Sequence, residues 1–384
     1  MSVTAAHGFV ASGVHCGIRR SRTDLAVVRS TERATGAALF TANRVQAAPV
    51  VVSRRHLELA EPQAVVVNSG NANAATGAQG EVDALATAAR AGELLGLETG
   101  EIVVLSTGVI GVPLPVDRIL GCLESAAASL SPDGGADAAH AILTTDTTTK
   151  QAVARDGVFV VGGMAKGSGM IHPNLATMLA VVTTDYPLEP SEAIEFLRPA
   201  VDESFNSISV DGECSTNDAV VLLANGASGA ARDDDAFRSA LHAVCSDLAA
   251  QIVADGEGAT VVAEIVVSGA ASPAEAKAIA RRIATSPLVK TALHGRDANW
   301  GRVLAAAGSA PYNGGYAQLD PALATLDFDG VRVLERGDPQ GVEPALEGET
   351  VTIALDLGLG GGSATYLTSD LSSEYVRINA DYRS

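Results

Sequence analysis

The chain has 384 residues, enough for two domains or one large layered unit, and 47% of them are hydrophobic although only 4% are aromatic. Ala, Val, Leu and Ile therefore supply most of the apolar surface, which is typical of an α/β or α+β enzyme. The net charge of −19 argues against a nucleic-acid-binding surface, because contacts to phosphates need Lys and Arg.

The four cysteines, Cys16, Cys122, Cys214 and Cys245, are scattered and form no C-x-x-C pair. We therefore expect reduced thiols rather than a disulfide framework or a zinc site. The first 20 residues lack the apolar core of a secretory signal, and no apolar run reaches the 18 residues of a membrane span. We expect a soluble cytoplasmic protein that binds neither nucleic acid, membrane nor metal.

Short apolar runs that end in Gly, Asn, Ser or Thr predict largely buried strands at residues 64–67, 102–105 and 220–223. Residues 351–357 alternate between apolar and more polar positions, which predicts a half-exposed strand. These strands are separated by helical stretches, so the pattern favours a layered α/β or α+β architecture.

Two helices have clear signals. Between residues 233 and 253, Phe237, Leu241 and Val244 begin a series at three- and four-residue spacing, which predicts one buried face. Ser272 can cap a second helix, with Pro273 at its first position and Glu275 closing a capping box. No repeat or low-complexity linker marks a domain boundary.

Two glycine-rich stretches, at residues 162–170 and 358–363, are candidate phosphate-binding loops. In the first, Lys166 precedes its glycine, whereas a P-loop needs Lys after the second Gly. The second lacks the final Gly of a dinucleotide fingerprint. We therefore expect plain glycine loops at both places.

After the first glycine stretch, a turn signal at Pro173-Asn174 leads into an apolar run that begins near Thr177. The residues alone allow two interpretations of Thr177. Thr is common in strands, so it fits a buried strand position. It also fits a nucleophile that attacks the preceding carbonyl and then uses its own freed α-amine, with a pKa near ~8, as general base.

One segment, from Lys166 to Leu179, and a series of collinear blocks along the whole chain match the pattern of a known family. The blocks are Leu39–Asn43, Ala47–Val50, Asn68–Asn73, Ser106–Gly111, Thr144–Thr147, Ser204–Asn206, Asp255–Thr260, His294–Arg302 and Tyr375–Tyr382. Together they resemble the ornithine acetyltransferase family, also called bifunctional glutamate N-acetyltransferases, and the segment from Lys166 to Leu179 resembles the family's self-cleavage region.

The resemblance implies self-cleavage between Ala176 and Thr177, giving an α chain (1–176) and a β chain (177–384) that stay associated. It implies an α+β fold, a layered α/β/β/α sandwich built from both chains, and an α2β2 or higher assembly. The implied reaction moves acetyl from N-acetylornithine to glutamate through acetyl-Thr177, in arginine biosynthesis, with no cofactor. Whether acetyl-CoA also serves as donor, which would make the enzyme bifunctional, stays open.

The resemblance also implies site residues. Thr107 and Gly108 would form the oxyanion hole, although the residues alone indicate only a tight turn after a strand. The implied substrate-binding residues are Thr144, Lys166, Thr177, Glu257, Asn379 and Ser384. Lys166 can pair with a substrate carboxylate or be a solvated loop lysine, and Glu257 can meet a substrate amine or simply lie in a turn that ends a helix.

Three positions depart from the family pattern. Ser384 stands in place of the usual Thr and keeps the hydroxyl, and Val261 replaces a common Lys, which weakens any expectation of acetyl-CoA use. Cys214 replaces a usual Thr within Asp211–Asp218, and we assign that block no catalytic role.

Two other functions are alternatives. One is a hydrolase, an aminopeptidase or amidohydrolase with the same N-terminal nucleophile, that passes the acyl group to water. The other is a non-catalytic small-molecule-binding protein, which would show neither chain cleavage nor an acetyl-enzyme.

Overall fold

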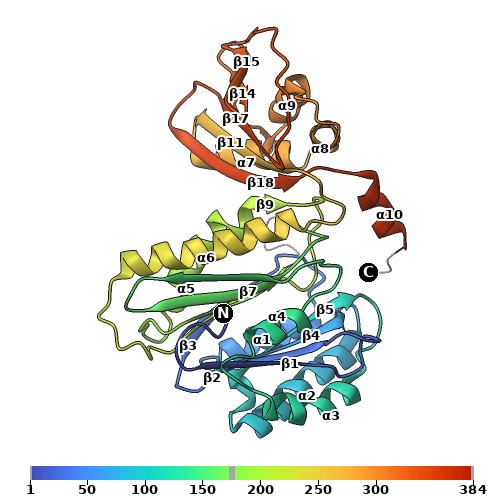
Figure 1. Cartoon of the computed structure of the whole chain (residues 1–384), viewed down its shortest axis with the longest axis vertical. Coiled ribbons are helices and arrows are strands. Elements are labelled where there is room, and N and C mark those ends of the chain that lie inside the picture. Colours follow the sequence, from blue (N-terminus) through green and yellow to red (C-terminus); the bar gives the residue numbers. More distant parts are fainter. Residues whose placement is uncertain (1, 173–177, 382–384) are drawn as a thin grey trace.

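The computed structural model describes residues 2–172 and 178–381, so Ala176, Thr177 and Ser384 lie outside the described residues. Figure 1 shows a layered part at the bottom, a smaller lobe above it, and a terminal helix at the side. In the described ranges, no helix is long and apolar enough to cross a membrane.

The first sheet has the strand order β1-β2-β4-β5, and its strands are β1 (Phe9–Val14), β2 (Leu25–Ser30), β4 (Ala64–Asn71) and β5 (Ile102–Val109). Strands β4 and β5 run parallel, and the connection between them contains a helix, as parallel pairs require. Three helices share a buried core with one face of this sheet: α1 (Ala48–Leu57), α2 (Gly77–Leu95) and α3 (Val116–Ala128).

The second sheet has the order β3-β10-β8-β7-β6, and its strands are β3 (Thr35–Phe40), β6 (Lys150–Arg155), β7 (Val160–Lys166), β8 (Leu179–Thr184) and β10 (Ala219–Ala224). One face packs against α5 (Ala193–Glu203) and α6 (Asp234–Ala254). Every residue of β8 and β10 is buried, because both faces of the sheet are covered.

The two sheets pack face to face. Val28, Val67 and Leu105 of the first sheet share a buried core with Met164 and Val181 of the second. The short helix α4 (Gly135–Ala141) contributes to the same core. The layers therefore run helix, sheet, sheet, helix, and the predicted α+β sandwich is confirmed.

The upper lobe contains a seven-stranded sheet of order β16-β15-β14-β17-β11-β18-β9. Its strands are β9 (Ile208–Ser209), β11 (Val262–Ala270), β14 (Thr325–Phe328), β15 (Val331–Glu335), β16 (Asp338–Pro339), β17 (Thr350–Asp356) and β18 (Gly362–Ser369). Its helices are α7 (Pro273–Ala284), α8 (Pro287–His294) and α9 (Trp300–Ala307). The lobe has its own buried hydrophobic core. The amino-acid composition shows no shift at the boundary of this lobe, so the sequence did not predict it.

The remaining elements are short: η1 (Thr99–Glu101), η2 (Phe205–Ser207), β12 (Pro311–Tyr312), β13 (Gly315–Tyr316) and α10 (Ser373–Asp381). Helix α10 follows the lobe and returns beside the layered part (Figure 1). None of its residues is fully buried, so it lies on the outside of the molecule.

The predicted strands and helices are present. Residues 64–67, 102–105 and 220–223 lie within β4, β5 and β10, and the alternating segment is β17 with Leu357 just beyond its end. Helix α6 begins after Asp233, whose side chain accepts a hydrogen bond from the Ala236 amide at 3.1 Å. Phe237, Leu241 and Val244 form its buried face as predicted.

Two local predictions were wrong. Gly162 and Gly163 lie in strand β7 rather than in a loop. A Cβ on Gly162 would meet the Ser2 carbonyl oxygen at 2.3 Å, so close packing, not turn geometry, explains the glycine. At α7, Ser272 caps the Glu275 amide, but the Glu275 carboxylate accepts from the Gln318 amide at 2.8 Å instead of closing a capping box.

Candidate active site

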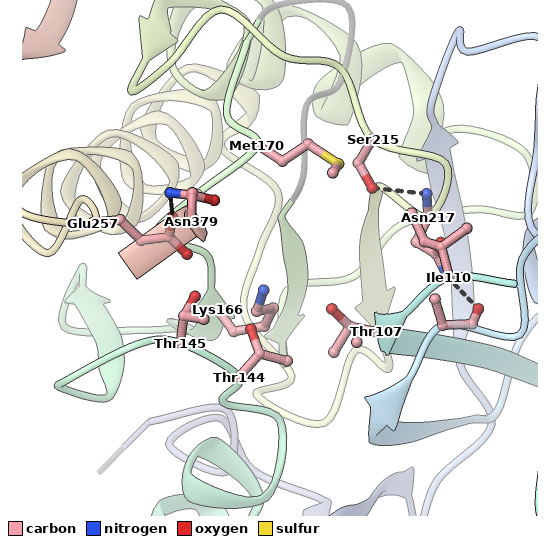
Figure 2. Close-up of a pocket in the computed structure, with 13 residues that line it drawn as sticks. Thr107, Ile110, Thr144, Thr145, Lys166, Met170, Ser215, Asn217, Glu257 and Asn379 are labelled. Atoms are coloured by element: carbon pink, nitrogen blue, oxygen red, sulfur yellow. Dashed lines mark hydrogen bonds between the residues drawn. The ribbon is translucent and has the colours of Figure 1, made fainter. Parts of the chain in front are cut away.

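One pocket brings together all the predicted oxyanion and substrate residues that the structure describes: Thr107, Gly108, Thr144, Lys166, Glu257 and Asn379. Figure 2 shows Lys166 and Thr107 on one side of the pocket and the Glu257–Asn379 pair on another. The pocket also contains residues that the sequence reasoning did not select: Ala72, Ile110, Thr145, Gly169, Met170, Ser215 and Asn217. Segments far apart in the chain therefore meet at one site, while Thr177 and Ser384 lie outside the described residues.

Thr107 and Gly108 lie near the end of β5, after its buried apolar run. Gly108 has φ +132°, and a Cβ there would meet the Gly70 backbone carbon at 2.3 Å. Only glycine fits this close approach to β4. The Thr107 hydroxyl has no hydrogen-bond partner among the described residues, so it is available to a ligand in the pocket.

The buried carboxylate of Asp146 holds in place the segments that carry Thr144 and Lys166, on another side of the pocket. It accepts hydrogen bonds from the Thr144 amide at 2.9 Å and the Gly167 amide at 2.7 Å, and from Lys150 Nζ at 2.6 Å. Burial pushes the pKa of Asp146 upward, but the charges of Lys166 and Lys150 outweigh it and hold the pKa well below its usual range. Asp146 therefore stays ionised and positions both Thr144 and the turn after Lys166.

Lys166 is the last residue of β7 and is only 3% exposed. The alternative of a solvated loop lysine is therefore wrong. The pKa of Lys166 is below its usual value, because burial and the neighbouring Lys150 charge lower it by more than the carboxyl groups of Asp146, Asp218 and Glu257 raise it. An ammonium in this position suits an anionic ligand group, because water reaches it poorly and the pocket lies in front of it (Figure 2).

Glu257 and Asn379 form a hydrogen-bonded pair. Asn379 Nδ2, on α10, donates to Glu257 Oε2 at 2.7 Å, and the Glu257 amide donates to the Ser168 carbonyl at 2.8 Å. Helix α6 ends at Ala254, so Glu257 lies in the turn after that helix and also lines the pocket. A Cβ on Gly169 would meet the Glu257 carboxyl carbon at 2.4 Å, so glycine is needed there for the carboxylate to reach the pocket.

The loop between β9 and β10 supplies Ser215 and Asn217 to the pocket. Asn217 Nδ2 donates to the Ala72 carbonyl at 2.6 Å and the Ser106 carbonyl at 2.8 Å. These bonds connect the loop before β10 of the second sheet to the ends of β4 and β5, the strand that carries Thr107. A run of polar residues before a buried strand was the only sequence signal for Asn217.

The site is thus a partly open polar pocket where β5 of the first sheet and β7 of the second sheet end, in a fold of four layers ordered α/β/β/α. A cation, a carboxylate and hydroxyl groups face this one space. A model of the ArgJ family matches residues 10–384. The chain is similar to the arginine biosynthesis bifunctional protein ArgJ of Symbiobacterium thermophilum, with 48% identity over all of this chain and 98% of that protein. The protein of the same name from Streptomyces coelicolor is 46% identical over the whole of both chains.

Among solved structures, the chain is similar to ornithine acetyltransferase from Mycobacterium tuberculosis in complex with ornithine. The identity is 39%, the match covers 45% of this chain and 94% of that one, and the TM-score is 0.41. The full-length match to the family model and to the relatives shows that the chain belongs to the ArgJ family. The enzyme class predicted from the sequence, an acetyltransferase of arginine biosynthesis, is confirmed.

Proposed function

We propose that the chain moves an acetyl group from N-acetylornithine to glutamate through an acetyl-Thr177 intermediate, after self-cleavage between Ala176 and Thr177. The observation that carries this proposal is the convergence of Thr107, Gly108, Thr144, Lys166, Glu257 and Asn379 on one pocket. The amide of Met178, the residue after the proposed nucleophile, donates to Asp218 Oδ1 at 3.0 Å, and Asp218 directly follows Asn217, which lines the pocket.

In the first half-reaction, the Thr177 hydroxyl adds to the acetamide carbonyl and its proton passes to the freed α-amine. The carbon–nitrogen bond then breaks, and ornithine leaves with that proton. In the second half-reaction, the glutamate amine attacks the acetyl ester, and the Thr177 oxygen recovers a proton. Thr107 and Gly108 would stabilise the oxyanion in both steps, where loss of a donor typically costs on the order of 10²–10³ in rate.

The charged residues suit amino-acid substrates. The Lys166 ammonium would pair with the substrate α-carboxylate, and the Glu257 carboxylate would meet an amine. Both N-acetylornithine and glutamate carry a carboxylate and a nitrogen at the reacting end, so the same residues can serve both half-reactions. Asn379 would hold Glu257 in position through its 2.7 Å hydrogen bond.

The second sheet supports a tightly associated pair of chains, 1–176 and 177–384. Its order places β8 between β10 and β7. Strands β3, β6 and β7 would belong to the α chain, and β8 and β10 to the β chain. Separation would expose buried strand edges, so the products would stay together. An α2β2 assembly and a cytoplasmic location complete the proposal.

Intact mass and denaturing electrophoresis of the purified protein test the cleavage. We expect two fragments from the wild type and one full-length, inactive chain from Thr177→Ala. Thr148→Ala, which changes an exposed threonine outside the pocket, is the control and should be cut normally. A wild type that is active without being cut would contradict the proposal.

Ornithine release separates the proposed transferase from the hydrolase. Without glutamate, we expect release to stop after about one equivalent, when all enzyme is acetylated. Continued release without glutamate would identify an amidohydrolase. A comparison of acetyl-CoA with N-acetylornithine as sole donor then decides whether the enzyme is bifunctional.

A further inference from the structure

Asp211 is a half-buried carboxyl group beside the pocket, although it is not among the described residues that line it. It lies in the loop between β9 and β10 and has no part in the proposed reaction. Its donors among the described residues are the Met170 amide at 2.5 Å, the Ile171 amide at 2.9 Å, the Glu213 amide at 3.1 Å and the Tyr375 hydroxyl at 3.2 Å. Except for Glu213, these donors lie far from Asp211 in the chain, so the carboxyl group joins separate segments.

On one side, Asp211 holds a turn that forms part of the pocket wall. Met170 lines the pocket and has φ +58°, in the left-handed region that residues other than glycine rarely adopt. Asp211 Oδ2 accepts the Met170 amide and Oδ1 accepts the Ile171 amide, so both oxygens stabilise this strained turn. The preceding residue, Gly169, lies against Glu257, since a Cβ there would be 2.4 Å from the Glu257 carboxyl carbon. The turn therefore limits one side of the space that the Glu257 carboxylate occupies.

On the other side, the same carboxyl group is bonded to helix α10. The Tyr375 hydroxyl donates to Asp211 Oδ2, the oxygen that also accepts the Met170 amide. Asn379 lies one turn further along α10 and on the same face as Tyr375, because four positions separate them. Asn379 Nδ2 donates to Glu257 Oε2 at 2.7 Å. Helix α10 therefore contacts the Glu257 carboxylate from a second direction.

We propose that Asp211 is a positioning residue: it ties the Gly169–Met170 turn to helix α10 and thereby fixes the Glu257 carboxylate in the pocket. This inference rests on the proposed function, which gives Glu257 its contact with a substrate amine. Asp211 acts through Glu257 and not on the substrate, because Glu257 lines the pocket and Asp211 does not. A carboxylate held in one place binds an amine better than one that must first be ordered, so the pair of links serves substrate binding.

Tyr375→Phe tests the link to the helix, because it removes one hydroxyl group and keeps the ring. Loss of this hydrogen bond should let α10 open more often, so we expect its amides to exchange with deuterium roughly threefold to tenfold faster. KM for N-acetylornithine should rise by a similar factor, and kcat should change less, because the link serves binding. The Met170 and Ile171 amides keep their acceptor and should exchange as in the wild type.

The matched control is Tyr366→Phe, the same chemical change in the core of the upper lobe. Tyr366 lies on β18, is fully buried, and its hydroxyl has no hydrogen-bond partner among the described residues. Its removal breaks no bond, so KM and the exchange of α10 should stay at their wild-type values. An unchanged KM for Tyr375→Phe would overturn the inference, whatever the exchange of α10.

Asp211→Asn tests both links at once, because an amide keeps only one of the two acceptor oxygens. We expect faster exchange in the turn as well as in α10, and a larger rise in KM than in Tyr375→Phe. Wild-type exchange of the Met170 and Ile171 amides in this variant would overturn the inference.

A double variant separates positioning from a general loss of stability. Tyr375→Phe and Asn379→Ala both act on Glu257 through α10, so together they should raise KM by less than the product of their single effects. A rise equal to that product would overturn the inference. A wild type that transfers no acetyl group would instead refute the proposed function, and the exchange measurements would still test the links, so the two failures are distinguishable.

Discussion

Asn379 donates a 2.7 Å hydrogen bond to Glu257, although 122 positions separate them in the chain. The bond links the terminal helix α10 to the turn after α6. A second link runs nearby, because the Tyr375 hydroxyl donates to Asp211 at 3.2 Å. Helix α10 has no fully buried residue, so polar bonds of this kind hold it against the pocket.

Replacing Asn379 with Ala should weaken substrate binding. A hydrogen bond to a charged group contributes about 1.5–3 kcal/mol, so we expect KM to rise by roughly tenfold or more. The control is Arg377→Ala on the same helix, because within the described ranges Arg377 pairs only with Glu374 and Asp381, on the exposed surface. Steady-state kinetics measure both variants, and an unchanged KM for Asn379→Ala would show that α10 does not contribute to the site.

A Gly169→Ala change should displace the Glu257 carboxylate, because the new Cβ would lie 2.4 Å from it. Displacement of a positioned group by about 1 Å can cost 10²-fold in rate, and we expect a loss of kcat/KM of that order. Gly121→Ala is the control, since a Cβ there meets nothing within 4 Å. Thermal unfolding should show that both variants are folded, and a fully active Gly169→Ala enzyme would contradict the assignment of Glu257.

Lys150→Met should destabilise the fold. The Lys150 ammonium is fully buried and pairs with both Asp146 and Asp255. Its removal breaks the ion pairs of two buried carboxylates and leaves Asp146 with the more distant charge of Lys166 alone, and breaking a buried pair costs about 3–5 kcal/mol. Urea unfolding measures the loss, and Arg90→Met, which breaks an exposed pair with Glu93, should change stability by about 1 kcal/mol or less. Equal effects of the two substitutions would show that the buried cluster is not a stabilising unit.

Asp146 should make stability depend on acid pH. Its pKa is lower in the folded chain than its usual value of 3.8, so the unfolded chain binds the proton more readily. The contribution is therefore complete above the usual value and is lost as the pH falls toward the folded value. We expect the stability difference between wild type and Asp146→Asn to shrink below about pH 4. A difference that stays constant during acidification would contradict this origin.

The sequence predicted the elements that local pattern determines. Helix α6 has a capping Asp233 and a regular apolar face, and β10 has an uninterrupted apolar run, so both were predicted close to their observed bounds. Strand β7 was not predicted because its glycines are required by close packing against residues far away in the chain. A Cβ on Gly163, for example, would lie 2.9 Å from Leu248 of α6. Several strands of the upper lobe have only two to five residues, too few for a clear period.

In the candidate site, too, some residues could be predicted from the sequence and others only from the fold. Lys166 and Glu257 were selected through the family resemblance, and their chemistry suits the proposed substrates. Asp146 and Asn217 were not selected, because their importance lies in bonds to groups that only the fold brings near. The Lys150–Asp255 pair, for example, joins residues 105 positions apart.

The central position of β8 has a consequence for how the mature enzyme is made. Its neighbours β7 and β10 are hydrogen-bonded to it on both sides, and all of its residues are buried. In the uncut chain, the β7–β8 pairing closes a short loop, whereas two separate chains must first find each other to form it. The proposed cut would therefore convert a folding step into an association step. Denatured mature enzyme should recover slowly and only at high concentration, so its lifetime would depend on the barrier to unfolding more than on the equilibrium.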